Sequence, residues 1–171
     1  MGKRKARLWL NPKIMGRYPL VRMISVHLFP KNFEQKECQV QGGCHCGFVR
    51  YETTGESITH ALCHCSDCRR HAGAPMVGWA MFTEGQVIIT KGQTKTYQSS
   101  EHGRREFCPV CGTGLFYKNA EMLPGIIDIQ TGTLDDPNQL PARCHIQTAE
   151  RISWIPEINT LPEFERFPPQ E

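Results

Sequence analysis

Seven of the nine cysteines in this 171-residue chain fall into three tight groups, and this grouping constrains the fold more than any other feature of the sequence. The groups are Cys44 and Cys46; Cys63, Cys65 and Cys68; and Cys108 and Cys111. Cysteines one residue apart cannot easily bridge to each other, and a disulfide framework normally pairs distant single cysteines. The grouping therefore favours thiolates that converge on metal ions, and it predicts a protein of a reducing compartment, the cytoplasm.

The pair Cys108 and Cys111 has the form of a zinc knuckle. Two thiolates three positions apart can reach one ion across a tight turn, and the following Gly112 permits the backbone to fold back. Structural zinc normally takes four ligands, so a second pair must come from elsewhere in the fold. The glycine-flanked Cys44 and Cys46 are the natural candidates. We therefore predict a closed, structural zinc site made by these four cysteines.

The remaining group, Cys63, Cys65 and Cys68, offers three thiolates, which leave a fourth position on a zinc ion for water or substrate. Three thiolates on a divalent ion carry a formal charge of about −1, which makes bound water less acidic than it is on a zinc held by neutral imidazoles. Such a site is better suited to binding a substrate thiol and presenting it as a nucleophile. The sequence predicts a reactive zinc here.

Two other ligand arrangements stay open at this stage. His64 or His71 could fill the fourth position of the three-cysteine group and make that site structural too. Alternatively, the cysteines could be shared differently between the ions, with Cys38 completing one set. Cys38 and Cys144 stand alone in the sequence and are expected to be plain small residues.

The rest of the chain predicts one all-β domain over residues 38–167. Short runs rich in aromatic and β-branched residues recur between Gly, Pro and polar turns, at residues 48–53, 77–82, 86–90, 94–98, 113–117, 126–131 and 145–148. Helical signals are limited to residues 66–71 and 161–166. The longest uncharged apolar stretch, residues 72–83, is far short of the roughly 18 residues that suggest a membrane span.

The net charge of +3 is unevenly divided. Residues 1–36 hold nine lysines and arginines against one glutamate, whereas the remainder holds eleven against sixteen acidic residues, so the two parts carry +8 and −5. We expect residues 1–37 to be a basic extension, unstructured or able to bind nucleic acid by counterion release, and residues 168–171 to be a tail. The acidic body argues against a broad nucleic-acid face.

Three motifs together give the chain a recognisable signature. They are GGCHCG at residues 42–47, CHCSDCRR at residues 63–70 and CPVCG at residues 108–112. In their order and spacing the chain resembles the glutathione-dependent formaldehyde-activating enzyme family, which also includes centromere protein V. The resemblance extends over residues 38–167 and includes Gly73, Trp79, the GTLD segment at residues 132–135, His145 and Trp154.

This resemblance implies a β-tent zinc fold of antiparallel strands with two Zn²⁺ ions per chain. By position, Cys44, Cys46, Cys108 and Cys111 would be the structural ligands, and Cys63, Cys65 and Cys68 the catalytic ones. The implied activity is that of a carbon–sulfur lyase of the S-(hydroxymethyl)glutathione synthase type, which adds glutathione to formaldehyde. A related thiol and another small aldehyde are also possible substrates of this chemistry.

Glutathione is anionic, so its site needs cationic partners. The candidates are Arg69, Arg70, Arg104 and Arg105, with His71 or His64 to carry a proton to the nascent alkoxide.

Two rival functions remain. One is a non-catalytic, zinc-stabilised binding module whose basic arm contacts nucleic acid. The other is a thiol redox role resembling the B-type methionine sulfoxide reductases, with Cys144 beside His145 as the nucleophile.

Overall fold

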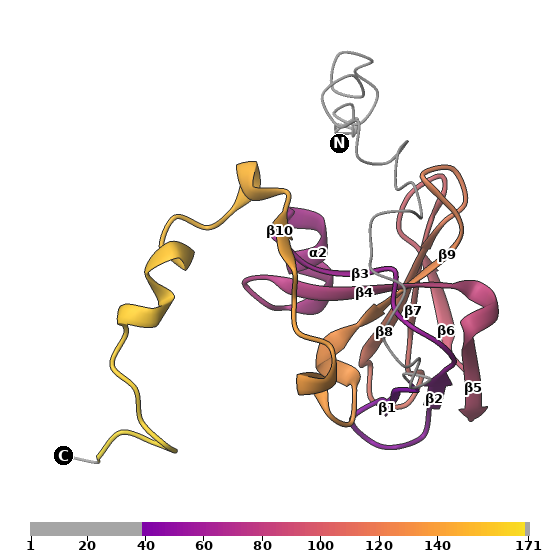
Figure 1. Ribbon diagram of the computed structural model, residues 1–171, viewed down its shortest axis with the longest axis horizontal. Coiled ribbons are helices and arrows are strands. Elements are labelled where there is room, and N and C mark those ends of the chain that lie inside the picture. Colours follow the sequence, from indigo (N-terminus) through magenta and orange to yellow (C-terminus); the bar gives the residue numbers. More distant parts are fainter. Residues whose placement is uncertain (1–38, 170–171) are drawn as a thin grey trace, which may run out of the picture. The chain divides into compact units, whose positions relative to one another are not determined.

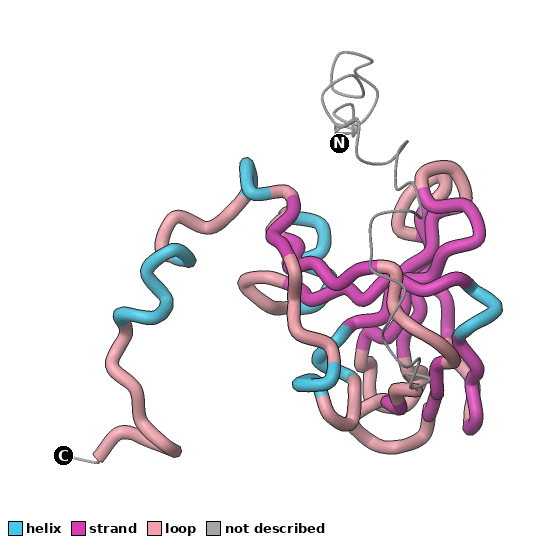
Figure 2. Tube along the Cα trace, in the orientation of Figure 1, coloured by secondary structure: helices cyan, strands magenta, loops and turns pink. Residues whose placement is uncertain are grey.

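The computed structural model describes residues 39–169, which form two β-sheets, one α-helix and several short 3₁₀ helices (Figures 1 and 2). The fold is all-β, as the sequence predicts. The predicted basic extension at residues 1–37 lies outside the described residues. Within residues 39–169, none of the helices has the length and apolar character that crossing a bilayer requires.

The smaller sheet has three antiparallel strands in the order β1-β2-β5. Their bounds are β1 Gln41–Gly43, β2 Arg50–Thr53 and β5 Val87–Lys91. Strand β1 is short because the two glycines that end it lead directly into the first cysteine pair. The turn between β1 and β2 therefore carries Cys44 and Cys46.

The larger sheet has seven strands in the order β10-β3-β4-β9-β8-β7-β6. Their bounds are β3 Thr59–Cys63, β4 Val77–Thr83, β6 Lys95–Gln98, β7 Gly103–Phe107, β8 Gly114–Asn119, β9 Leu123–Gln130 and β10 Cys144–Ile146. All neighbours are antiparallel except β10, which pairs parallel to β3 and so departs from the predicted antiparallel pattern. The seven predicted strand segments are confirmed; β1, β3 and β7 were not predicted.

Helix α2, Ser66–Ala72, confirms the helical segment predicted at residues 66–71. Cys65 caps it: its Sγ accepts the N–H of Cys68 at 3.3 Å. Gly73 ends it in the left-handed conformation, with φ of 64° and its N–H bonded to the Arg69 carbonyl. Local hydrogen bonds thus fix both ends of the helix, and the bond at its N-terminus joins Cys65 to Cys68 in the first turn.

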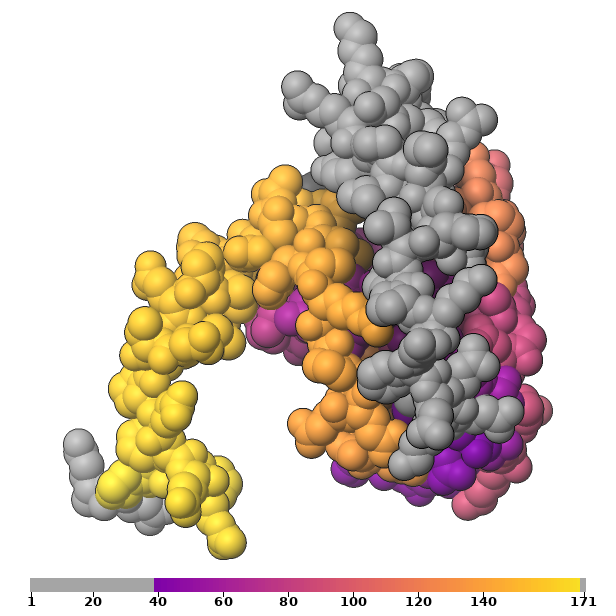
Figure 3. Space-filling model, viewed as in Figure 1, coloured from indigo at the N-terminus to yellow at the C-terminus, as the bar shows by residue number. Residues whose placement is uncertain are grey.

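The helix predicted at residues 161–166 is wrong. The chain instead forms 3₁₀ helices at Thr148–Glu150 and Ile155–Thr160 and continues without regular structure. Leu161 and Phe164 are exposed, so no packed face supports a helix there, and so short a helix is unstable without one. Figure 3 draws this C-terminal segment in yellow.

The main core lies between the two sheets. Val40, Val49 and Tyr51 from the smaller sheet and its flanks pack with residues of β4, β8 and β9, including Phe82, Phe116 and Ile129. The rings of Tyr51 and Phe116 meet edge to face, with centroids 5.1 Å apart. Burial of each such side chain contributes about 1.5–3 kcal/mol.

A second cluster of buried side chains lies where α2 covers the larger sheet. Cys63, Cys65, Val77 and Trp79 form it, and Cys68, Ala72 and Tyr117 pack against them. The three-cysteine group is therefore part of this cluster and not of the main core. The short 3₁₀ helices Glu84–Gln86, Thr131–Thr133 and Pro137–Gln139 connect strands elsewhere.

Candidate functional site

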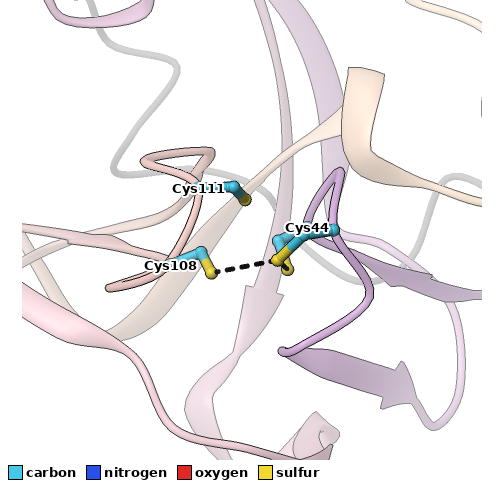
Figure 4. Close-up of side chains that lie close together, drawn as sticks. Cys44, Cys108 and Cys111 are labelled. Carbon is cyan, nitrogen blue, oxygen red and sulfur yellow. Dashed lines mark hydrogen bonds between the residues drawn. The ribbon is translucent and has the colours of Figure 1, made fainter.

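The first cysteine cluster is formed by two hairpin turns that are far apart in the sequence. The Sγ atoms of Cys44, Cys46, Cys108 and Cys111 all lie within 4.8 Å of one another. Figure 4 shows Cys108 and Cys111 on one loop facing Cys44 on another. The turns also meet through their polar groups, because the backbone N–H of His45 donates to Thr113 Oγ1 at 3.2 Å. We call this the four-cysteine cluster.

Hydrogen bonds to sulfur fit this cluster to a metal ion. The backbone N–H groups of Val49 and Val110 point at Cys44 Sγ and Cys108 Sγ, at 3.2 Å and 3.4 Å. Such bonds stabilise thiolates, which are the form that binds metal. Bonds from the Thr113 hydroxyl and backbone likewise lower the pKa of Cys111 to about 5. An all-sulfur set of four is the donor set of structural zinc sites.

Glycines with left-handed backbones close both turns. Gly47, with φ of 72°, follows Cys46, and Gly112, with φ of 77°, follows Cys111. A side chain at either position would be strained, so glycine is required for the chain to return toward the next strand. The spacing of the cysteines predicts this pairing correctly: the structure brings together the four residues expected to form the closed site.

The second cluster comes from one continuous segment. Cys63 ends β3, Cys65 caps α2 and Cys68 lies in the first turn of that helix. Their Sγ atoms lie within 4.8 Å of one another, and within residues 39–169 no carboxylate oxygen, imidazole nitrogen or further sulfur joins them. We call this the three-cysteine cluster. Its donor set fits a zinc ion with an open position.

The thiols of the three-cysteine cluster share their protons unequally. Hydrogen bonds from Cys63 and Cys65, aided by the positive charge of Arg105, lower the pKa of Cys68 to about 3. Bonds to Cys65 and Cys68, with burial, raise the pKa of Cys63. Arg105 thus favours the thiolate form at Cys68, the sulfur that it contacts.

Neither histidine considered as a fourth ligand belongs to the cluster. His64 is fully buried, and its Nε2 lies 2.9 Å from Nδ1 of His145. His71 lies one helical turn after Cys68, and its buried Nε2 has no hydrogen-bond partner among the described residues. Burial and the nearby Arg105 lower the pKa of His71, so it is neutral at physiological pH. Cys38 lies outside the described residues.

Arg105 on β7 places a cation in contact with the three-cysteine cluster. Its side chain is 3% exposed, and its Nη2 lies 2.6 Å from Asp67 Oδ2 and 3.8 Å from Cys68 Sγ. The guanidinium also stacks over the Tyr117 ring at 4.8 Å. A buried charge needs such partners, so Arg105 is held in place to face the sulfurs.

The other predicted arginines lie elsewhere. Arg104 precedes Arg105 on β7 and donates to the Glu101 carbonyl at 3.3 Å. Arg69 donates to the carbonyls of His64 and Glu150, at 3.2 Å and 3.4 Å. Arg70 is exposed on α2. Of the five side chains predicted to bind substrate, Arg105 contacts the cluster, and His71 lies near Arg105 on the helix that carries Cys68.

Two residues of β9 near this cluster carried no signal in the sequence. Gln130 pairs across the sheet with Trp79, and Asp128 pairs with Tyr117. Asp128 is 8% exposed, and desolvation raises its pKa to about 6. The Gln130 side chain is half-buried, with its Nε2 enclosed. A lone polar residue in a strand is normally read as solvent-facing, so only the sheet register identifies the face on which these two lie.

Cys144, the nucleophile of the predicted redox alternative, lies exposed on β10. It belongs to neither cluster. Its neighbour His145 is engaged with His64. The His145 imidazole is therefore not directed at the Cys144 thiol to activate it.

Comparisons with known proteins agree with the cysteine pattern. Residues 39–150 match the family model of the glutathione-dependent formaldehyde-activating enzyme. An uncharacterized lyase of Schizosaccharomyces pombe is 28% identical over 79 residues, which cover 46% of this chain and 57% of that protein. The chain thus matches little more than half the length of this curated relative. A crystal structure of a Rhodobacter sphaeroides protein has a similar fold, with a TM-score of 0.50 and 24% identity over 61% of this chain and 98% of that one.

Proposed function

This chain belongs to the glutathione-dependent formaldehyde-activating enzyme family, and from that premise we propose that it is a lyase that joins glutathione, or a related thiol, to formaldehyde or another small aldehyde. The observation that carries the proposal is the difference between the clusters. One offers four sulfurs and the other three, within residues 39–169. A zinc ion with four sulfur ligands has no position left for a substrate and is structural, whereas a zinc ion with three sulfur ligands keeps one position for a substrate.

The four-cysteine cluster would hold a structural zinc ion. Binding at Cys44, Cys46, Cys108 and Cys111 would join the β1–β2 turn to the β7–β8 turn and contribute directly to folding. A zinc ion bound by Cys63, Cys65 and Cys68 would supply a position at which a substrate thiol is held as its thiolate. A reducing compartment such as the cytoplasm would keep all seven cysteines available.

The reaction adds a thiol across a carbonyl group. A carbon–sulfur bond forms, the π bond of the aldehyde breaks, and its oxygen takes up a proton equal to the one that the thiol gives up. His71 is the side chain that we propose to hand over this proton. Its Nε2 is unpartnered within the described chain and lies near the Gln130 amide at Gly114. In the same residues His64 also has an unpartnered nitrogen, Nδ1, but its Nε2 is engaged with His145.

Arg105 would offset the negative charge of the three thiolates, because its guanidinium lies 3.8 Å from Cys68 Sγ. Arg70 is the best placed of the remaining arginines to receive a glutathione carboxylate, because it is exposed on the helix that carries Cys68. Arg69, which donates to two backbone carbonyls, would instead hold the segment at Glu150 against α2.

Metal analysis and activity of matched cysteine variants test this proposal. The purified protein should hold about two zinc ions, and a screen of thiols with aldehydes should detect turnover that Cys63→Ser and Cys65→Ser abolish. Circular dichroism of Cys65→Ser should show the native fold, whereas Cys108→Ser should unfold. If Cys65→Ser unfolds as thoroughly as Cys108→Ser, the division into a reactive and a structural site is wrong.

A further inference from the structure

Buried nitrogen atoms without hydrogen-bond partners gather around the three-cysteine cluster. In the described residues they include Nε and Nη1 of Arg105, Nε2 of His71 and Nε2 of Gln130. These side chains come from β7 and β9, two strands of the larger sheet with β8 between them, and from helix α2. Buried polar groups are nearly always paired in folded proteins, so several unpaired polar nitrogens at one place indicate a bound ligand.

Gln130 reaches this place through the register of the sheet. Cys63 pairs with Val77 and Trp79 pairs with Gln130, and directly paired residues point to the same face. Val77 and Trp79 are two residues apart on β4, so they too share that face. Gln130 thus lies on the face that carries the three-cysteine cluster.

Gly114 on β8 leaves room for the Gln130 amide. A Cβ atom at Gly114 would lie 2.5 Å from Gln130 Nε2 and 3.3 Å from His71 Nε2. Gly114 does not have the positive φ that elsewhere requires glycine. Gly114 is the first residue of β8. A glycine in a strand commonly marks a close approach of another group, and here that group is the amide beside the imidazole.

We propose that the Gln130 amide binds the aldehyde oxygen in this reaction. This inference rests on the proposed function. As the thiol sulfur bonds to the carbonyl carbon, the π electrons move to the oxygen, which becomes an alkoxide. The Gln130 N–H donates a hydrogen bond to that oxygen, and the proton released by the thiol reaches it through His71. Preorganised N–H donors aimed at developing negative charge are an established source of rate enhancement.

The enclosure of these atoms also sets the size of the aldehyde. The unpaired nitrogens of Gln130 and His71 are buried, so a carbonyl group can reach them only if its substituents are small. Formaldehyde, with hydrogen on both sides of its carbon, meets this condition. We therefore expect rates to fall as the aldehyde lengthens.

Two variants separate oxygen binding from thiol binding. Gln130→Met keeps the side-chain length and removes the N–H donors, and Gly114→Ala places a methyl group against the amide. Each should lower kcat/KM for formaldehyde by about 100-fold, with less than about a twofold change in KM for glutathione and unchanged zinc content. Gly132→Ala is the control, because a Cβ there meets no atom within 4 Å, and it should keep the wild-type rate.

A spectroscopic readout uses the unaltered protein. The side-chain amide resonances of Gln130 should shift when zinc-loaded protein receives glutathione with formaldehyde, and should stay in place with glutathione alone. Wild-type turnover with unchanged kcat/KM for formaldehyde in Gln130→Met, or an amide that shifts with glutathione alone, overturns the inference and leaves the proposed function standing. If the wild-type protein turns over no thiol and aldehyde pair, the proposed function fails and the inference fails with it.

Discussion

Arg105 on β7 donates a hydrogen bond to Asp67 on α2, with 2.6 Å between Nη2 and Oδ2. Arg105 stands three residues before Cys108, and Asp67 immediately precedes Cys68. The contact therefore links the strand that leads into the four-cysteine cluster to the helix that carries part of the three-cysteine cluster.

Replacement of Arg105 by methionine should weaken metal binding at the three-cysteine cluster. The variant keeps the bulk of the side chain but removes the positive charge near Cys68, and loss of a hydrogen bond to a charged group costs about 1.5–3 kcal/mol. We expect zinc affinity at this cluster to fall at least tenfold, as measured by competition with a chelator. Arg105→Lys should retain part of the affinity. An equal loss in Arg104→Met, the neighbouring control, would contradict this role.

Asp128→Asn should stabilise the protein at neutral pH and much less at acidic pH. Burial raises the pKa of Asp128 from 3.8 to about 6, so the folded state binds the proton more tightly than the unfolded state. The stability of the wild-type protein therefore falls as pH rises through about 4 to 6, by about 2–3 kcal/mol. The gain in Asp128→Asn should be larger at pH 7.5 than at pH 5.

Urea unfolding of both proteins at the two pH values measures this difference. The carboxyl resonance of Asp128 should titrate with a midpoint near pH 6. A gain that is equal at both pH values would show that the carboxyl is not the group concerned.

The two cysteine clusters could be predicted from the sequence because cysteine spacing is itself a geometric constraint. The strands that hold those sites were harder to predict. Strand β3 reads THALC and strand β7 reads GRREF, and neither has the alternation of β-branched or aromatic residues that indicates a strand. Their strand conformation depends on neighbours: β3 is paired on both sides, and β7 buries Arg105 against Tyr117.

The residues that we propose to contact substrate were harder still to predict. Four arginines and one histidine near the cysteines were equivalent in the sequence, and only tertiary packing distinguishes buried Arg105 from exposed Arg70. Gln130 lies 62 residues after Cys68 and reaches its face of the sheet through strand register alone. Local pattern carries no information about such a pairing.

Gly112→Ala should destabilise the protein through the backbone of the four-cysteine cluster. Gly112 has φ of 77°, and a residue with a Cβ in this left-handed region costs about 1–2 kcal/mol. No atom within 4 Å would meet the new methyl group, so the effect should come from backbone strain. Thermal unfolding should show a lower midpoint, whereas Gly85→Ala, with open space and no positive φ, should unfold as wild type does.

Cys111→Ser and Cys144→Ser should differ in metal content although both cysteines are exposed. Cys111 belongs to the four-cysteine cluster, so its loss should release that zinc ion, leave about one ion per chain and lower the unfolding midpoint. Cys144 belongs to neither cluster, so its variant should keep about two ions. Zinc loss in Cys144→Ser would show that the exposed thiol on β10 takes part in metal binding.

The neighbours Arg104 and Arg105 have the same side chain but lie on opposite faces of the sheet, because successive side chains of a strand point to opposite sides. Deletion of one residue between β6 and β7 that shifted the pairing of β7 by one position would exchange them, turning Arg104 toward the sulfurs and Arg105 to solvent. An arginine would still face the helix after such a slip, because Arg104 would take the position of Arg105 opposite Tyr117. A relative with both arginines and a one-residue gap in the β6–β7 hairpin could therefore have the other arginine facing the helix. An alignment of residue identities would not reveal this exchange, so such relatives should be compared by their strand pairing.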